Sequence, residues 1–328
     1  MITRRAALRA GGIGLLVACR PGRGQGVAAI RRIGWLSIGS KDSPTDLYVA
    51  FKQGMRDLGW QEGTNVEYQF LYADGKLDRL DAMAEEFVRR AIDIIIVGNP
   101  LTTRAAQRAT KTVPILMTGV SDPVTHGFVT SLAKPGGNIT GVISVPEEVQ
   151  GKLIEILHEI APRARRIAVV LNESNLNHPA LWNATQKACS TLDLVALHIA
   201  ATTPGQFGAV VEQIIALRSQ AVVVGADPMF LNERVKLQAL MQSTRLPVAY
   251  SLRQHVLEGG LLSYSADLAE LIRYAAKYAH RILQGAKPAD LPVEQPTKFE
   301  LVINLNTAQS LGLPPPRSLL LRADEVVK

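Results

Sequence analysis

Short, wholly apolar runs alternate with amphipathic stretches along most of the chain, and this alternation constrains the fold more than any other feature. Residues 94–97 read Ile-Ile-Ile-Val, and residues 167–171 read Ile-Ala-Val-Val-Leu. Strands that are apolar on both faces are typical of parallel sheets covered by helices on both sides. Leu47, Phe51 and Met55 recur at the spacing of an amphipathic helix. The pattern therefore predicts an α/β fold.

The expected strands and helices form two successive series, which meet near residues 144–146. A chain of 328 residues is long enough to form two α/β lobes, each with its own buried core. We predict two similar lobes, each a parallel sheet flanked by helices.

The basic residues of the chain are concentrated at its N-terminus. Residues 1–32 contain seven of the 36 Lys and Arg residues and none of the 29 acidic residues, so the remainder carries no net charge. A neutral body offers no field that would follow a phosphate backbone, and aromatic residues make up only 5% of the chain. We therefore predict that the protein does not bind nucleic acid.

The order of residues at the N-terminus is typical of an export signal. Residues 1–9 are basic, residues 10–18 are apolar, and Cys19 follows. Residues 3–8 resemble a twin-arginine signal, so the Sec and twin-arginine routes both remain open. Residues 16–19 resemble a lipobox, in which Cys19 would be lipidated; the alternative is cleavage a few residues later. We predict that residues 1–32 are an export signal and linker.

These features predict a protein exported to the periplasm, and we expect it to act as a monomer. No apolar run reaches the ~18 residues that a membrane-spanning helix needs. Contact with the membrane would therefore depend on a lipid at Cys19. The other cysteine, Cys189, lies in an apolar-periodic stretch and is expected to be a buried thiol without a disulfide partner.

Ligands of open parallel sheets bind beyond the carboxyl ends of the strands, where helix N-termini also point. Polar residues follow the expected strands of both lobes, and we predict that ten of these strand-end residues bind the ligand: Ser37, Ser40, Asn99, Thr102, Ser121, Asp122, Asn172, Asn175, Asp227 and Tyr250. Hydroxyls and amides at helix starts can hold a carboxylate, while Asp227 or Asp122 can accept from an amine.

The same residue types are also favoured as helix caps and in turns, whatever the function. Asp227, for example, precedes Pro228 and can be an N-cap. Trp35 and Tyr48 are candidates for an apolar wall of the site, together with Phe230 and Tyr250. Capping and ligand binding remain open alternatives for the polar residues.

Catalytic and metal-binding patterns are absent from the sequence. It contains no GxSxG, GxxxxGK[ST], HExxH or CxxC motif, and its six histidines lack metal-ligand spacing. We therefore predict a binding protein without cofactor or metal, and not an enzyme.

Three long segments resemble a known family. Residues 114–143 read PILMTGVSDPVTHGFVTSLAKPGGNITGVI, and residues 247–267 read PVAYSLRQHVLEGGLLSYSAD. Residues 282–313 read ILQGAKPADLPVEQPTKFELVINLNTAQSLGL. Together they are similar to the ABC transporter substrate-binding protein family that includes tryptophan- and tyrosine-binding members. The similarity extends from about Ile33 to the C-terminus.

The resemblance implies a type I periplasmic binding protein with a ligand cleft between its two lobes and three crossovers. Residues 33–143 and about 266–288 would form lobe 1, and residues 144–265 and about 289–328 would form lobe 2. Relatives often carry a small or hydroxyl residue at the position of Asn99, which leaves the class of ligand open because an amide can donate as well as accept.

The function implied is that of a solute receptor for an ABC-type uptake system. The two lobes would close on a small molecule, and the closed form would dock on an ABC permease in the inner membrane. An amino acid or related small carboxylate is the expected ligand, with aromatic amino acids among the candidates. The alternative is a periplasmic sensor that passes closure to a signalling partner.

Overall fold

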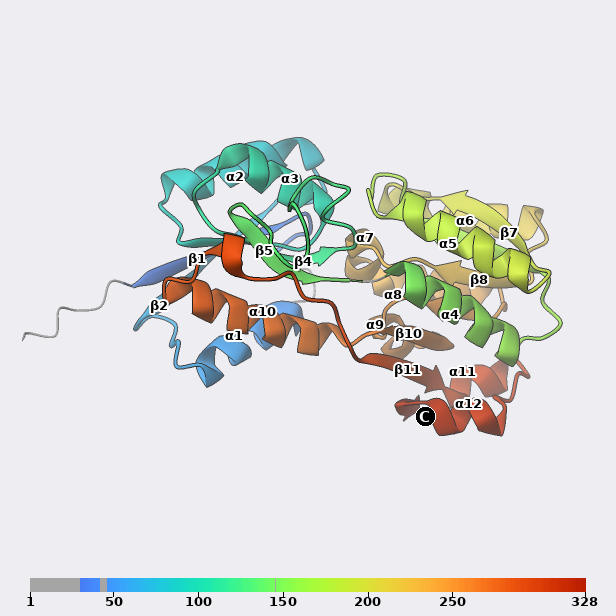
Figure 1. Ribbon diagram of the computed structural model, residues 1–328. Coiled ribbons are helices and arrows are strands. Elements are labelled where there is room, and N and C mark those ends of the chain that lie inside the picture. Colours follow the sequence, from blue (N-terminus) through green and yellow to red (C-terminus); the bar gives the residue numbers. More distant parts are fainter. Residues whose placement is uncertain (1–29, 42–45, 145) are drawn as a thin grey trace, which may run out of the picture.

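Two lobes lie next to each other, and each is built on one sheet (Figure 1). The computed structural model describes residues 30–41, 46–144 and 146–328. The predicted export signal up to residue 29, including Cys19, lies outside the described residues.

The first lobe contains five parallel strands in the order β2-β1-β3-β4-β5. Its strands are β1 (Arg31–Ser37), β2 (Val66–Tyr72), β3 (Ile94–Val97), β4 (Ile115–Val120) and β5 (Ile139–Ile143). Its first three helices are α1 (Asp46–Asp57), α2 (Leu80–Arg89) and α3 (Pro100–Ala109), with a 3-10 turn at Leu77–Arg79. All four residues of β3 are buried, because helices cover both faces of this sheet.

The second lobe contains seven strands in the order β12-β11-β10-β9-β8-β6-β7. The strands are β6 (Arg166–Leu171), β7 (Val195–Ala200), β8 (Ala221–Val224), β9 (Val248–Tyr250), β10 (Leu262–Ala266), β11 (Phe299–Asn304) and β12 (Glu325–Val327). The helices are α4 (Pro146–Ile160), α5 (His178–Thr191), α6 (Phe207–Ala216), α7 (Pro228–Asn232), α8 (Arg234–Ser243), α9 (Gln254–Leu257), α11 (Leu305–Ser310) and α12 (Arg317–Arg322). Two sheets flanked by helices confirm the predicted α/β fold with two lobes.

The pairing of β10 with β11 is antiparallel, whereas the other neighbouring strands of this sheet are parallel. The chain leaves the second lobe at the end of β10 and returns to it at the start of β11. Both of these ends face the first lobe, so the two strands must run in opposite directions.

Helix α10 (Leu268–Leu283) belongs to the first lobe, where it packs along α1 (Figure 1). A β-carbon at Gly54 would lie only 2.8 Å from Cβ of Ala276, so glycine permits this close approach. The Trp60 indole N–H also donates to Nδ1 of His280 at 3.0 Å. Among the described residues no helix, α10 included, is long and apolar enough to cross a bilayer.

Residues 291–294 also lie on the first lobe. The Thr140 hydroxyl donates to the Leu291 carbonyl at 2.6 Å, and the backbone N–H of Ile143 donates to the Glu294 carbonyl at 2.8 Å. We propose that the first lobe comprises residues 31–144 and 267–294 and the second residues 146–266 and 299–328. The third crossover then lies at residues 295–298, a few residues beyond the boundary expected near residue 289.

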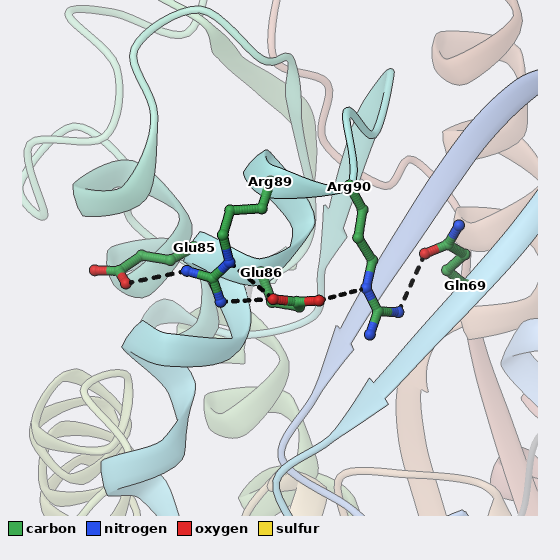
Figure 2. Close-up of polar contacts among 5 residues, drawn as sticks. All are labelled: Gln69, Glu85, Glu86, Arg89 and Arg90. Atoms are coloured by element: carbon green, nitrogen blue, oxygen red, sulfur yellow. Dashed lines mark hydrogen bonds and ion pairs between the residues drawn. The ribbon is translucent and has the colours of Figure 1, made fainter.

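An ion-pair cluster joins the end of α2 to the edge strand β2 of the first lobe (Figure 2). The Glu86 carboxylate accepts from Arg90 Nε at 2.8 Å and from Arg89 at 2.6 and 2.9 Å, and Arg90 continues to Gln69 at 3.3 Å. Hydrogen bonds from Arg90 and Arg89 lower the pKa of Glu86. This cluster fastens one helix to the outer edge of the sheet.

Candidate functional site

Two adjoining cavities lie between the lobes, at the carboxyl ends of strands from both sheets. Their volumes are about 210 Å³ and 280 Å³. Six residues line both cavities and mark the place where they meet: Ile38, Asn99, Asn175, Asp227, Pro228 and Asn232. Since both lobes contribute to this set, the cavities belong to one interlobe cleft. The cleft lies at the carboxyl ends of the strands, where open parallel sheets bind their ligands.

Asp227 follows β8 and is only 2% exposed. Its Oδ1 accepts from the backbone N–H of Met229 at 2.7 Å and so caps α7. Its Oδ2 accepts from the side-chain amides of Asn172 at 3.1 Å and Asn175 at 2.8 Å. A carboxylate has about four acceptor sites. The protein occupies three of them, which leaves acceptor capacity for a donor in the cleft.

His178, at the start of α5, fixes the loops that carry this carboxylate. Its Nδ1 accepts from the backbone N–H of Asn172 at 2.6 Å, and its Nε2 lies 3.0 Å from the Ala226 carbonyl oxygen. Because Nδ1 accepts, Nε2 carries the proton and donates to that carbonyl. Burial lowers the pKa of His178, so the ring is neutral near pH 7. The ring therefore ties the loop after β6 to the loop after β8.

Asn99 is the N-cap of α3 and the first-lobe counterpart of Asp227. Its Oδ1 accepts from the backbone N–H groups of Leu101 and Thr102, both at 3.0 Å, and Pro100 occupies the first helical position. Its amide nitrogen has no hydrogen-bond partner in the described part of the chain. Because Asn99 lines both cavities, this nitrogen can donate to a ligand.

The first cavity has an apolar wall from the first lobe. The rings of Trp35 and Tyr48 meet edge to face at 4.6 Å, and Leu47, Leu268 and Ile272 also line this cavity. Burial raises the pKa of Tyr48 to about 12, so its hydroxyl remains protonated at neutral pH. Such a wall suits an aromatic ring or a branched apolar side chain.

Asn177 joins the two lobes directly. Its side-chain oxygen accepts from the Ser121 hydroxyl at 2.8 Å, and its amide nitrogen donates to the Gly119 carbonyl at 3.3 Å. Its backbone N–H donates to Oδ1 of Asn175, which in turn contacts Asp227. One loop therefore holds the cleft carboxylate and also bonds to the opposite lobe.

The ten predicted site residues divide into two groups. Ser37 lines the first cavity, Ser40 and Asn172 line the second, and Asn99, Asn175 and Asp227 line both. The other four line neither cavity: Thr102, Ser121, Asp122 and Tyr250.

Tyr250 is corrected to a core residue of the second lobe. Its hydroxyl donates to Gln238, and its ring stacks on His255 at a centroid distance of 4.7 Å. Successive residues of a strand point to opposite faces, so the next residue, Ser251, lines the first cavity instead. Phe230, also considered for the apolar wall, is likewise fully buried in the core.

The other three residues have local or interlobe roles. Thr102 is buried in the first turn of α3, where its hydroxyl donates to the Asn99 carbonyl at 3.1 Å. Asp122 accepts from the backbone N–H of Thr125 at 3.0 Å, and its hydrogen bonds with Thr125 lower the pKa of Asp122. Ser121 contacts Asn177 as described above. We leave these residues out of the proposed ligand contacts.

Sequence reasoning missed Asn177, His178 and Ser265. Asn177 lies only two residues beyond the predicted Asn175, so a wider reading of the same strand-end loop would have included it. His178 is not part of any metal-ligand motif in the sequence, and its two backbone hydrogen-bond partners are known only from the folded structure. Ser265 lies within β10 rather than in a loop.

The described residues that line the two cavities include no Lys, Arg or His, whereas Asp74, Asp227 and Glu233 contribute carboxylates. Such a lining favours a ligand with a cationic group, and amides, hydroxyls and backbone N–H groups would bind any carboxylate. Within residues 30–41, 46–144 and 146–328, no three His, Cys, Asp or Glu side chains come together in a way that would hold a metal ion.

Comparison with known proteins points to one family. A family model described as ABC transporter substrate binding protein matches residues 32–327. A tyrosine-binding protein of Clostridioides difficile strain R20291 is 25% identical over 266 residues, which cover 80% of this chain and 75% of that protein.

Solved structures share the fold over nearly the whole chain. A Streptococcus pneumoniae ABC domain in complex with L-Trp gives a TM-score of 0.84 at 25% identity, covering 91% of this chain and all of that one. The ligand-free, open structure of a Clostridium difficile substrate binding protein gives a TM-score of 0.66 at 23% identity, covering 91% of this chain and all of the other.

Proposed function

The chain belongs to the family of ABC transporter substrate binding proteins, and from this premise we propose that it is an exported receptor that binds an aromatic amino acid in its interlobe cleft for uptake. The observation that carries this proposal is the position of Asp227. Its carboxylate, held by Asn172 and Asn175, lines the same cavity as the Trp35–Tyr48 wall.

The lining assigns a role to each end of such a ligand. The ammonium group would donate to Asp227, because an amine is the donor that a carboxylate binds most strongly. The carboxylate would accept from the Asn99 amide nitrogen and from hydroxyls such as that of Ser37. The ring would lie against Trp35 and Tyr48. The tyrosine-binding and L-Trp-bound relatives support this class of ligand.

Titration calorimetry of the purified protein with L-tyrosine, L-tryptophan and L-phenylalanine tests the proposal. Asp227→Asn should weaken binding by about 10- to 100-fold, because a hydrogen bond to a charged group contributes ~1.5–3 kcal/mol. Asp122→Asn is the matched control, since Asp122 lines neither cavity. Equal affinities of both variants and the unaltered protein would remove Asp227 from the site, and no binding of any of the three ligands would overturn the proposal.

Export and uptake are separate parts of the proposal. We propose that residues 1–32 direct export to the periplasm, with Cys19 either lipidated or removed by cleavage. Mass spectrometry of the mature N-terminus distinguishes these outcomes. Both walls of the cleft come from one chain, which supports action as a monomer. Deletion of the gene should abolish uptake of the labelled ligand through the permease; intact uptake together with lost transcriptional responses would favour a sensor.

A further inference from the structure

Ser265 is a buried hydroxyl residue at the edge of the first cavity. It lies in β10, immediately before the crossover to α10, and is 4% exposed. Its Oγ has no hydrogen-bond partner in the described part of the chain. Burying an unpaired hydroxyl carries an energetic cost, so such groups usually have a partner. Since Ser265 lines the cavity, a bound ligand can supply that partner.

The sheet order fixes the position of Ser265 relative to Asp227. Asp227 follows β8, Ser251 follows β9, and Ser265 lies near the end of β10; these three strands are parallel neighbours. Strands are about 4.8 Å apart in a sheet, so the strands of Asp227 and Ser265 are about 10 Å apart. One aromatic amino acid can bridge this span from its ammonium group to the far edge of its ring.

Ser251 lies between these two residues but already has its partners. Its hydroxyl lies 3.2 Å from Oε1 of Gln150 and 3.2 Å from the Val224 carbonyl oxygen, both of which can accept from it. Of these two hydroxyls, that of Ser265 is therefore the one without a partner among the described residues. Leu252, Leu268 and Ile272 also line the cavity, so it can hold an apolar ring together with a polar group that reaches Ser265.

We propose that Ser265 selects aromatic amino acids that carry a hydrogen-bonding group on the ring, as tyrosine and tryptophan do and phenylalanine does not. This inference rests on the proposed function and narrows its class of ligand. A serine hydroxyl can accept from an indole N–H and can donate to or accept from a phenol. Phenylalanine in the same position would leave the hydroxyl unpaired, and sites built around a hydrogen bond discriminate strongly against analogues that lack it.

The experiment compares the affinities of L-tyrosine, L-tryptophan and L-phenylalanine for the unaltered protein, Ser265→Ala and Ser263→Ala. Ser263 is a matched control, because its hydroxyl is also buried and unpartnered among the described residues but it does not line either cavity. The unaltered protein and Ser263→Ala should prefer tyrosine or tryptophan over phenylalanine by at least about tenfold, which corresponds to one hydrogen bond of ~1.4 kcal/mol.

Ser265→Ala should lose that preference through weaker binding of the polar ligand, while its affinity for phenylalanine is unchanged or higher. Retained phenylalanine binding shows that the variant is folded and its cleft intact. A preference that survives in Ser265→Ala, or one that Ser263→Ala loses equally, would overturn the role of Ser265 and leave the proposed function standing. If none of the three ligands binds the unaltered protein, both proposals fail.

Discussion

Replacement of Asn177 by alanine should shift the lobes toward an open arrangement and weaken ligand binding. The Asn177 side chain makes three hydrogen bonds that cross from the second lobe to the first. Its oxygen accepts from the Ser121 hydroxyl at 2.8 Å and from the Ser121 backbone N–H at 3.5 Å, and its nitrogen donates to the Gly119 carbonyl at 3.3 Å. Alanine removes all three bonds. It leaves the backbone N–H of residue 177 able to donate to Asn175 as before.

The magnitude follows from the number of bonds lost. Each intramolecular hydrogen bond contributes about 0.5–1.5 kcal/mol net, so the two shorter bonds together contribute about 1–3 kcal/mol to closure, and the 3.5 Å bond adds little because it is at the limit of hydrogen-bond distance. A loss of ~2 kcal/mol lowers the closure equilibrium about 30-fold. If ligand binds the closed form, the apparent dissociation constant of a mostly open protein rises by a similar factor. Ser121→Ala removes one of these bonds and should have a smaller effect.

Calorimetry gives the affinity, and small-angle X-ray scattering of the ligand-free protein gives the degree of opening. Asn138→Ala is a matched control, because Asn138 donates to Val113 at 2.8 Å and to Thr110 at 3.3 Å within the first lobe. It should lower the free energy of unfolding without changing ligand affinity. The reasoning is refuted if Asn177→Ala binds ligand as tightly as the unaltered protein, or if Asn138→Ala weakens binding to the same extent.

Two further predictions concern stability. Burial lowers the pKa of His178 and lowers that of His255 to about 3. Below about pH 6.5 the unfolded chain therefore takes up protons that the folded chain does not, and the free energy of unfolding should fall by up to about 1.4 kcal/mol per pH unit for each histidine. Urea denaturation from pH 8 to pH 4 measures this slope. His255→Phe keeps a ring against Tyr250 and should reduce the slope. An unchanged slope in this variant would contradict the lowered pKa of His255. A β-carbon at Gly119 would lie 2.2 Å from the Gly98 carbonyl oxygen, whereas one at Gly151 in α4 would meet no atom within 4 Å. Gly119→Ala should therefore destabilise the fold by about 1–3 kcal/mol, and Gly151→Ala should stabilise it by about 0.5–1 kcal/mol. Denaturant midpoints of the two variants measure these effects, and equal midpoints would count against the steric argument.

The sequence predicts the elements of this fold well where local chemistry decides them. The run Ile94–Val97 forms the buried strand β3 because no polar residue interrupts it. Asn99 and Pro100 start α3 because the first caps the helix with its side-chain oxygen and the second tolerates the first helical position. Neither feature depends on distant residues.

The antiparallel direction of β11 cannot be predicted from local sequence patterns. Its direction depends on where the chain re-enters the second lobe, and residues 291–294 first bind to β5 of the first lobe. No local pattern distinguishes a segment that covers one lobe from a segment that continues into the next. We therefore propose a crossover a few residues later than the boundary expected from the sequence.

Asn99, Asn175 and Asp227 line the cleft because each follows a strand, and parallel strands end at the same edge of a sheet. The same rule included Tyr250, although the alternation of side chains along β9 directs Tyr250 into the core. Asn177 and Ser265 required the structure. The partners of Asn177 lie more than 50 residues away in the sequence, on the opposite lobe. The hydroxyl of Ser251 has a hydrogen-bond partner and that of Ser265 has none among the described residues, and only the folded structure shows this difference.

Helix capping and ligand binding, which the sequence presents as alternatives, use different atoms of the same residues in this cleft. Asn99 caps α3 with its side-chain oxygen, which leaves its nitrogen for a ligand. Asp227 caps α7 with Oδ1, while Oδ2 accepts hydrogen bonds from the amides of Asn172 and Asn175. Because each cap fixes its side chain during folding, the remaining atoms lose little conformational entropy when a ligand arrives. A long Lys or Arg in these positions would have to be ordered on binding. Short, capped side chains would therefore suit the proposed receptor, in which the ligand rather than the ordering of the site would drive closure.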